Sequence, residues 1–304
     1  MYLIVFVCFC LCTLSALCVL AKYVPDLRSS VLAHGKLQSV ADRPTSSLSR
    51  VVASWTVPKS WFTHFYIVGL AFALICSAEL TAATLRRKYG LLLTFLRHWD
   101  NPYWGDTLSL TESYLGTTLM TIHLARRVYE SFYIEKLSPT ARMHVSHYLV
   151  GIGFYGAMVF GTWLEGAVSF GVWPESSPAL RSFHYIYALI SVTLFIYASL
   201  HQYRCHAILA SLRTKKTNTT YSIPRGDWFE RIVTPHYFCD ILIYASLCIL
   251  YRFRNRVLLC GLIWTTLNLS VTASETQRWY CRTFGPLYTT TFPRKRWIII
   301  PCVY

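Results

Sequence analysis

Three short segments of the sequence bring together side chains that can exchange protons or bind anions. Each combines histidine with other polar or basic groups at the edge of an apolar run, and they cover residues 64–66, 123–130 and 201–206. Histidine titrates near neutral pH, whereas arginine keeps its charge and binds phosphate or carboxylate oxygens through paired N–H groups. Ionisable groups placed beside a membrane are costly unless partners or water satisfy them. We therefore expect the three segments to form one functional site.

Fixed positive charge suits a cofactor that carries phosphate groups. The arginines that offer it are Arg127, Arg213, Arg278 and Arg296. The segment 213–231 also mixes basic with aromatic side chains, as proteins that bind single-stranded nucleic acid do. However, the basic residues are spread over several short loops, and no nucleic-acid recognition motif accompanies them. A nucleotide cofactor therefore fits this pattern better, and we expect no nucleic acid partner.

Two further motifs are interpreted as structural. Neither the zinc-binding pattern His-Glu-x-x-His nor repeated histidine boxes occur, so the sequence predicts no metal site. Gly151, Gly153 and Gly156 match the letters of a dinucleotide-binding pattern, but they lie inside an apolar run and not between a strand and a helix. Small residues that let helices approach each other closely explain them better.

The elements that must position these groups are membrane helices. The chain has 304 residues, of which 54% are hydrophobic and 14% are charged, whereas a soluble domain has about 25% charged residues. Seven segments approach the length of about 20 mostly apolar residues that a membrane-spanning helix needs. They are residues 2–21, 61–83, 107–125, 147–170, 183–201, 237–251 and 257–274. The sequence thus predicts an all-α, multi-pass membrane bundle of about seven transmembrane helices.

The basic residues predict how this bundle is oriented. Of the 29 Lys and Arg residues, 21 fall in segments that alternating helices place on one side of the membrane. Cytoplasmic loops are enriched in these residues. We therefore expect a lumenal N-terminus and a cytosolic C-terminus, with the three polar segments at cytosolic helix ends. Residues 1–56 are expected to form a signal-anchor helix and a cytosolic loop, and residues 57–304 the functional membrane domain.

Three longer motifs carry a resemblance to a known family. They read VPKSWFTHFY at 57–66, LHQYRCHAIL at 200–209 and IPRGDWFE at 223–230. Together with the chain from Phe292 to its end, they resemble the polyprenol reductase branch of the steroid 5α-reductase family. The resemblance implies a seven-helix reductase of the endoplasmic reticulum membrane. Such an enzyme uses NADPH to saturate the alpha-isoprene double bond of a long-chain polyprenoid, on the route to the dolichol that serves protein N-glycosylation.

The resemblance also implies roles for individual residues. The positions that align with cofactor-binding residues are Arg127, Gln202, His206, Arg213, Tyr221, His236, Asp240, Tyr280 and Arg296. Relatives commonly have Asn and Glu where this chain has His236 and Asp240, and a histidine-containing run where it has residues 275–278. The steroid-reducing branch polarises its substrate carbonyl with a Gln-Glu pair and a Tyr. Those positions here are His64-Phe65 and Leu124, so we expect the donor to be His64, followed by His123 and Tyr66.

The chemistry of the reaction selects among substrates. Hydride addition to a carbon–carbon double bond leaves negative charge, which a conjugated aldehyde delocalises onto its oxygen and an allylic alcohol does not. A single donor aimed at such an oxygen typically contributes roughly 3 kcal/mol. We therefore expect polyprenal, not polyprenol, to be the molecule reduced. A steroid 3-oxo-4-ene or a trans-2-enoyl-CoA remains an alternative substrate, and hydropathy alone also fits a seven-span receptor or transporter.

Overall fold

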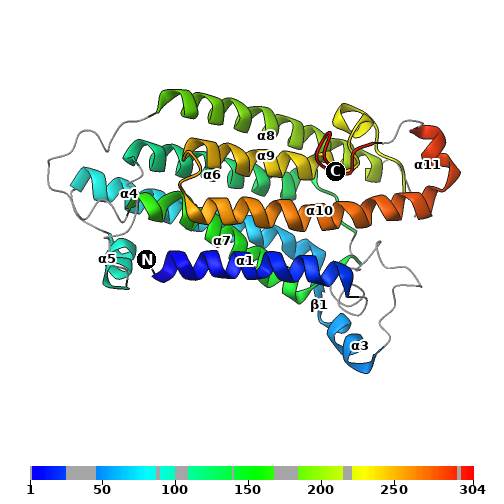
Figure 1. Ribbon diagram of the computed structural model, residues 1–304, viewed down its shortest axis with the longest axis horizontal. Coiled ribbons are helices and arrows are strands. Elements are labelled where there is room, and N and C mark those ends of the chain that lie inside the picture. The colour runs from blue at the N-terminus through cyan, green and yellow to red at the C-terminus, as the bar shows by residue number, and fades with distance from the viewer. Residues whose placement is uncertain are drawn as a thin grey trace.

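The computed structural model of the protein describes residues 2–24, 46–86, 90–99, 109–138, 140–167, 184–214, 221–292 and 296–304 (Figure 1). Its helices are α1 (Tyr2–Tyr23), α3 (Ser47–Ser54), α4 (Phe62–Arg86), α5 (Leu91–Trp99), α6 (Leu110–Tyr129), α7 (Val145–Ala167), α8 (Tyr185–Thr214), α9 (Pro235–Leu250), α10 (Arg256–Phe284) and α11 (Pro286–Thr291). Two short strands are β1 (Thr56–Pro58) and β2 (Arg142–His144). Most of the predicted cytosolic loop after α1, residues 25–45, lies outside the described residues.

Within the described residues, each of the seven apolar segments is helical, and these helices run side by side in one bundle (Figure 1). α8 packs on α9, α9 on α10, and α10 on both α1 and α7, while α4 contacts α6 and α7. The start of α1 and α5 lie at one end of the bundle, and β1, α11 and the C-terminus lie at the other (Figure 1). One hydrophobic core includes Leu11 of α1 and Trp163 of α7. The first helix therefore packs as part of the bundle.

Among the residues that the structure describes, four stretches are long and apolar enough to cross a membrane. They are Tyr2–Tyr23, Lys59–Ala82, Tyr185–Arg213 and Arg256–Phe284, and α9 is a shorter apolar helix of 16 residues. The predicted helical membrane bundle is thereby confirmed in outline. The number of seven spans and the orientation of the two termini stay predictions.

Two helices extend well beyond the predicted spans. α8 continues past residue 201 to Thr214, and α10 continues past residue 274 to Phe284. No glycine or proline interrupts either extension, and both contain good helix formers such as Gln and Arg. The extension of α8 places His201, Gln202 and His206 on one rigid helix.

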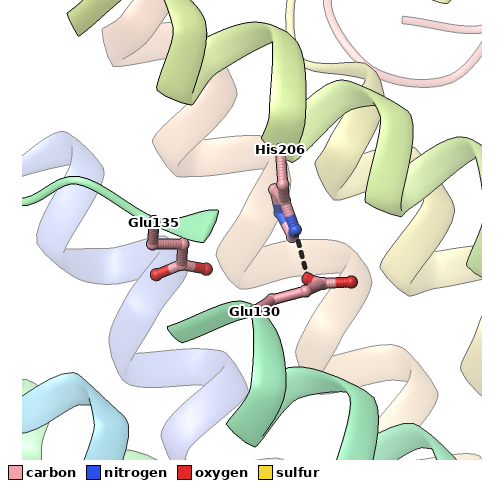
Figure 2. A group of neighbouring side chains, drawn as sticks. All are labelled: Glu130, Glu135 and His206. Carbon is pink, nitrogen blue, oxygen red and sulfur yellow. Dashed lines mark hydrogen bonds and ion pairs between the residues drawn. The ribbon is translucent and has the colours of Figure 1, made fainter. Parts of the chain in front are cut away.

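The end of α6 changes its winding. α6 begins with a capping box formed by Ser109 and Glu112, and after Tyr129 it continues as a π-helical turn, Glu130–Ile134. The backbone N–H of Glu135 donates to the carbonyl of Glu130 across this turn. Single π turns inside helices are rare and frequent at functional sites. Here the turn brings Glu130 and Glu135 toward the same side of the bundle (Figure 2).

A small antiparallel ladder departs from the all-α prediction. β1 pairs with β2 in the register Thr56↔His144, Val57↔Met143 and Pro58↔Arg142. Arg142 reinforces the pair, since its Nε donates to Thr56 Oγ1 at 2.7 Å. β1 leads into α4 and β2 leads into α7, so the ladder fixes the starts of two neighbouring helices. Strands of three residues are too short to give a period-two pattern that sequence could reveal.

Candidate active site

A cavity of about 470 Å³ lies among α4, α7, α8, α9 and α10 and the segment that follows the π turn. Basic side chains line it at the end of the bundle that carries β1, namely Lys59, Lys136, Arg142 and Arg213. On α10 the lining runs from Glu275 back to Thr265, a distance of about 15 Å at 1.5 Å per helical residue. In this deeper part the lining is aromatic and includes Phe154, Tyr155, Tyr244 and Trp264.

Arg127 organises the polar part of the cavity. It is 5% exposed, and its Nη2 donates to Tyr66 Oη at 2.7 Å and to Glu135 Oε1 at 2.8 Å. Its Nη1 forms an ion pair with Glu130. The guanidinium also lies over the ring of Tyr66, 4.6 Å from the ring centroid. One buried cation on α6 thus fixes a phenol of α4 and two carboxylates of the π turn and the segment after it.

His206 completes this network from α8 (Figure 2). Its Nδ1 lies 2.7 Å from Glu130 Oε2 and donates to it, while the carboxylate of Glu135 lies on the other side of the imidazole. The ligand atoms of Glu130, Glu135 and His206 all lie within 4.8 Å of one another. Arg126 and Arg127 contact these carboxylates and balance their charge. Within the described residues, this group is therefore an ion-pair cluster with no excess negative charge to hold a cation.

Glu130 is ionised at neutral pH. It lies beyond the predicted span 107–125, and its side chain is fully buried. Burial alone raises the pKa of a carboxyl group, but the hydrogen bond from His206 and the charges of Arg127 and Arg126 together lower the pKa of Glu130 to about 2. The carboxylate therefore remains a fixed negative charge between two arginines.

Gln202 links this cluster to α9. Its side-chain oxygen accepts a hydrogen bond from Arg126. Its Nε2 donates to Asp240 Oδ1 at 2.5 Å and contacts the backbone oxygen of His236 at 3.3 Å. Because an amide both accepts and donates, one fully buried glutamine joins an arginine of α6 to an aspartate of α9. The side chains of α6, α8 and α9 thus form one continuous polar network beside the cavity.

Comparison with known proteins places this arrangement in a family. The sequence profile of the 3-oxo-5-alpha-steroid 4-dehydrogenase family matches residues 152–304. Polyprenal reductase 1 of Oryza sativa subsp. indica is 30% identical over an alignment that covers 91% of this chain and 88% of that protein. The polyprenal reductase of Xenopus tropicalis is 29% identical over 90% of this chain and 87% of that one. Polyprenal reductase 2 of Arabidopsis thaliana is 29% identical, with coverages of 82% and 83%.

The chain belongs to the 3-oxo-5-alpha-steroid 4-dehydrogenase family. The resemblance to its polyprenol reductase branch, which the three motifs predict, is confirmed by these relatives. The profile match covers most of α7 and all of α8 to α11. In this family member the cavity also receives Tyr66 from α4 and Arg127 from α6, which precede the matched region.

Many of the residues predicted for this family's site meet at the cavity. The predicted residues that line it are Tyr66, Arg127, His206, Arg213, His236 and Asp240. Gln202 contacts Asp240 and His236 directly. The substitutions at His236 and Asp240 keep polar side chains at both positions of the cavity wall.

The two predicted histidine donors do not line the cavity. His64 Nδ1 lies 3.2 Å from Tyr148 Oη, and its imidazole lies beside the ring of Trp61. His123 is fully buried behind the wall, where it contacts Arg126 and packs edge-on against the ring of Tyr244. Of the three predicted catalytic residues, only Tyr66 faces the cavity.

The remaining predicted cofactor residues gather around the end of α10 and line no part of the cavity. Arg296 donates to Phe229 O at 2.7 Å and to Tyr288 Oη at 2.8 Å, and Tyr280 stacks on Tyr288. Tyr221 packs edge-on against Trp279, and Arg278 pairs with Glu275. Their part in cofactor binding stays a prediction.

Sequence reasoning missed the polar face of α10. Thr265, Asn268, Thr272 and Glu275 all line the cavity. Their spacing of three, four and three residues places them on one face of a helix. A polar face inside an otherwise apolar span was the available signal, since such a face in a membrane helix indicates a protein-lined or wet interior.

Proposed function

We propose that the protein is a polyprenal reductase that uses NADPH to saturate the alpha-isoprene double bond of a polyprenal during dolichol synthesis. The observation that carries this proposal is the nearly full-length similarity to proteins named polyprenal reductase in plants and a frog. The cavity agrees with it, because its volume lies in the range of small-molecule sites. It also joins a basic part to an aromatic part, as an anionic cofactor and an isoprenoid require.

The residues of the basic part fit a cofactor that carries phosphates. Lys59, Arg142 and Arg213 line the cavity around one end, and arginine binds phosphate oxygens through two parallel N–H groups. Bound NADPH would supply a hydride. Asp240, which lines the cavity and accepts from Gln202, would hold uncharged hydroxyl groups of the cofactor, since a carboxylate accepts hydrogen bonds from such groups.

We further propose that the basic end faces the cytosol and that the chain crosses the endoplasmic reticulum membrane seven times with a lumenal N-terminus. The excess of Lys and Arg in the segments on this side supports that orientation. The end of the bundle that carries β1, α11 and the C-terminus would then be cytosolic (Figure 1). A cofactor drawn from the cytosol reaches the cavity from that end.

The test is consumption of NADPH by the purified full-length protein in detergent with four substrates side by side. They are a polyprenal, the matching polyprenol, a trans-2-enoyl-CoA and a 3-oxo-4-ene steroid. We expect oxidation of NADPH with polyprenal, accompanied by formation of the saturated aldehyde, and none with polyprenol alone. Reduction of polyprenol without any aldehyde would overturn the assignment of the substrate. Faster turnover of the steroid or the enoyl-CoA would reassign the enzyme within its family.

A further inference from the structure

Two buried hydroxyl groups in the deeper part of the cavity lack hydrogen-bond partners. Tyr244 and Thr265 are 2% and 5% exposed, and both line the cavity. Neither Tyr244 Oη nor Thr265 Oγ1 forms a hydrogen bond of normal geometry with any described residue, although the phenol of Tyr155 lies nearby. Buried polar groups without partners are rare in folded proteins because they cost free energy. An oxygen atom of a bound ligand is the kind of group that would satisfy such a hydroxyl group.

The surroundings of these hydroxyl groups make them strong donors. The rings of Phe154 and Tyr244 lie 5.5 Å apart, and Trp264 lines the same part of the cavity. Aromatic walls exclude water, and a hydrogen bond in such a medium stabilises developing charge more than the same bond does in water. The position is therefore suited to a polar atom at the head of an apolar molecule.

The other candidate hydrogen-bond donors either already contact another polar side chain or lie outside the cavity. Tyr66 also lines the cavity, but its hydroxyl group belongs to the ion-pair cluster, since its oxygen accepts from Arg127. His64 is paired with Tyr148, and His123 reaches Tyr244 without lining the cavity. Among these candidates, Tyr244 is the one that lines the cavity with a hydroxyl group outside the ion-pair cluster and without a hydrogen bond of normal geometry.

We propose that Tyr244, with Thr265 beside the same cavity, donates a hydrogen bond to the aldehyde oxygen of the substrate and so takes the role that the sequence predicts for His64. This inference rests on the proposed function. In the step it serves, a hydride joins the carbon β to the aldehyde, the π electron pair of the double bond moves toward the carbonyl oxygen, and NADPH is oxidised to NADP⁺. A proton from water then joins the α carbon and the carbonyl bond reforms. Tyr244 stabilises the oxygen while it carries the charge.

The test compares Tyr244→Phe with the unchanged full-length protein in detergent, because this change removes only the hydroxyl group. We expect kcat with polyprenal to fall about 100-fold to 1000-fold, as loss of one oxyanion donor does elsewhere, while NADPH binds with unchanged affinity. The melting temperature of the ligand-free variant should change little, because the hydroxyl group forms no hydrogen bond of normal geometry with the neighbouring Tyr155. Thr265→Val should lower kcat in the same direction by a smaller factor.

The matched control is Tyr114→Phe, which removes a phenol that donates to the backbone oxygen of Leu80 and does not line the cavity. We expect it to keep the kcat of the unchanged protein. Full kcat in Tyr244→Phe would overturn the inference, as would loss of NADPH binding or of folding in that variant, which would make the role structural. If the unchanged protein itself fails to oxidise NADPH with polyprenal, the proposed function fails and not merely the role of Tyr244.

Discussion

At Glu130, the protein holds one buried carboxylate between Arg126, Arg127 and His206. Its pKa in the folded protein is about 2, compared with an ordinary value of 4.5. A lowered pKa means that folding favours the ionised form. The resulting stabilisation is complete above about pH 4.5 and is lost as the pH falls toward about 2, where the carboxylate becomes protonated in the folded protein as well. The contribution of Glu130 to the stability of the fold therefore decreases in acid and does not change in alkali.

Replacing Glu130 by Gln should lower the free energy of unfolding at neutral pH by about 3–5 kcal/mol, because it leaves buried arginine charge without its partner. The stability of the variant should also fall less than that of the unchanged protein on acidification below about pH 4.5. Thermal unfolding in detergent at a series of pH values measures both effects. The control is Glu230→Gln, whose partner Arg225 is largely exposed, so a change of less than about 1 kcal/mol is expected. Equal stability of Glu130→Gln and the unchanged protein at neutral pH would contradict this account.

Residue types in the sequence predicted the polar network beside the cavity better than they predicted the hydrogen-bond donor to the substrate. Arginine, histidine and glutamine are conspicuous in an apolar chain because burying them is costly, so Arg127, Gln202 and His206 could be found without coordinates. Tyr244 and Thr265 could not, since tyrosine and threonine occur in apolar helices as ordinary packing residues. Only the three-dimensional arrangement reveals that their hydroxyl groups are buried and unpaired.

At the scale of helices, the three glycines Gly151, Gly153 and Gly156 do not share one structural role. A Cβ atom at Gly151 would lie 2.5 Å from Phe65 Cε2, so α7 and α4 approach closely there. At Gly153 and Gly156 an added Cβ would meet no atom within 4 Å. The sequence interpretation of the motif as a close contact between helices is therefore correct for Gly151, and the other two glycines do not serve it.

Gly151→Ala should destabilise the protein by about 1–3 kcal/mol, because the buried ring of Phe65 must move to admit the methyl group. Gly153→Ala and Gly156→Ala are matched controls on the same helix. Both should be neutral or stabilising by up to about 1 kcal/mol, since alanine favours helix more than glycine does. Thermal unfolding of the three variants measures the difference, and a similar effect at all three positions would argue against a specific contact at Gly151.

Sequence predicted the helices more securely than their ends. All seven apolar segments are helices because long apolar runs in a membrane must satisfy their backbone internally. α8 and α10 continue past the predicted spans because hydropathy detects the membrane boundary, whereas a helix ends where capping or a breaking residue stops it. The π turn after Tyr129 depends on packing around Glu130 and left no pattern in the sequence.

At the scale of the whole molecule, 29 basic residues outnumber 14 acidic ones. Part of this positive charge is concentrated at one end of the cavity. Lys59, Lys136, Arg142 and Arg213 line its basic end. Such a concentration of one sign of charge attracts an anionic ligand and weakens as salt screens it. In the proposed function, the 2′-phosphate of NADPH, which NADH lacks, adds negative charge that this end of the cavity would bind.

Arg213→Gln should therefore weaken the binding of NADPH more than that of NADH, and added salt should reduce the preference of the unchanged protein for NADPH. Fluorescence titration of each cofactor at low and high salt measures this. Arg278→Gln is the comparison, because Arg278 is half exposed and does not line the cavity. The sequence predicts both residues as cofactor ligands, so a larger loss of NADPH affinity in Arg278→Gln than in Arg213→Gln would contradict the basic end of the cavity as the phosphate site.

The size of the cavity limits how much of the lipid substrate the protein can enclose. A space of about 470 Å³, which in the proposed function also receives the cofactor, has room for only the aldehyde end of a polyprenal, and it is far too small for a chain of many isoprene units. Everything beyond that stretch must stay among the acyl chains of the bilayer, out of contact with the groups that perform the reaction. The length of the finished dolichol is then decided by the prenyl-transfer reaction that builds its precursor, and the reductase treats long and short homologues in the membrane alike.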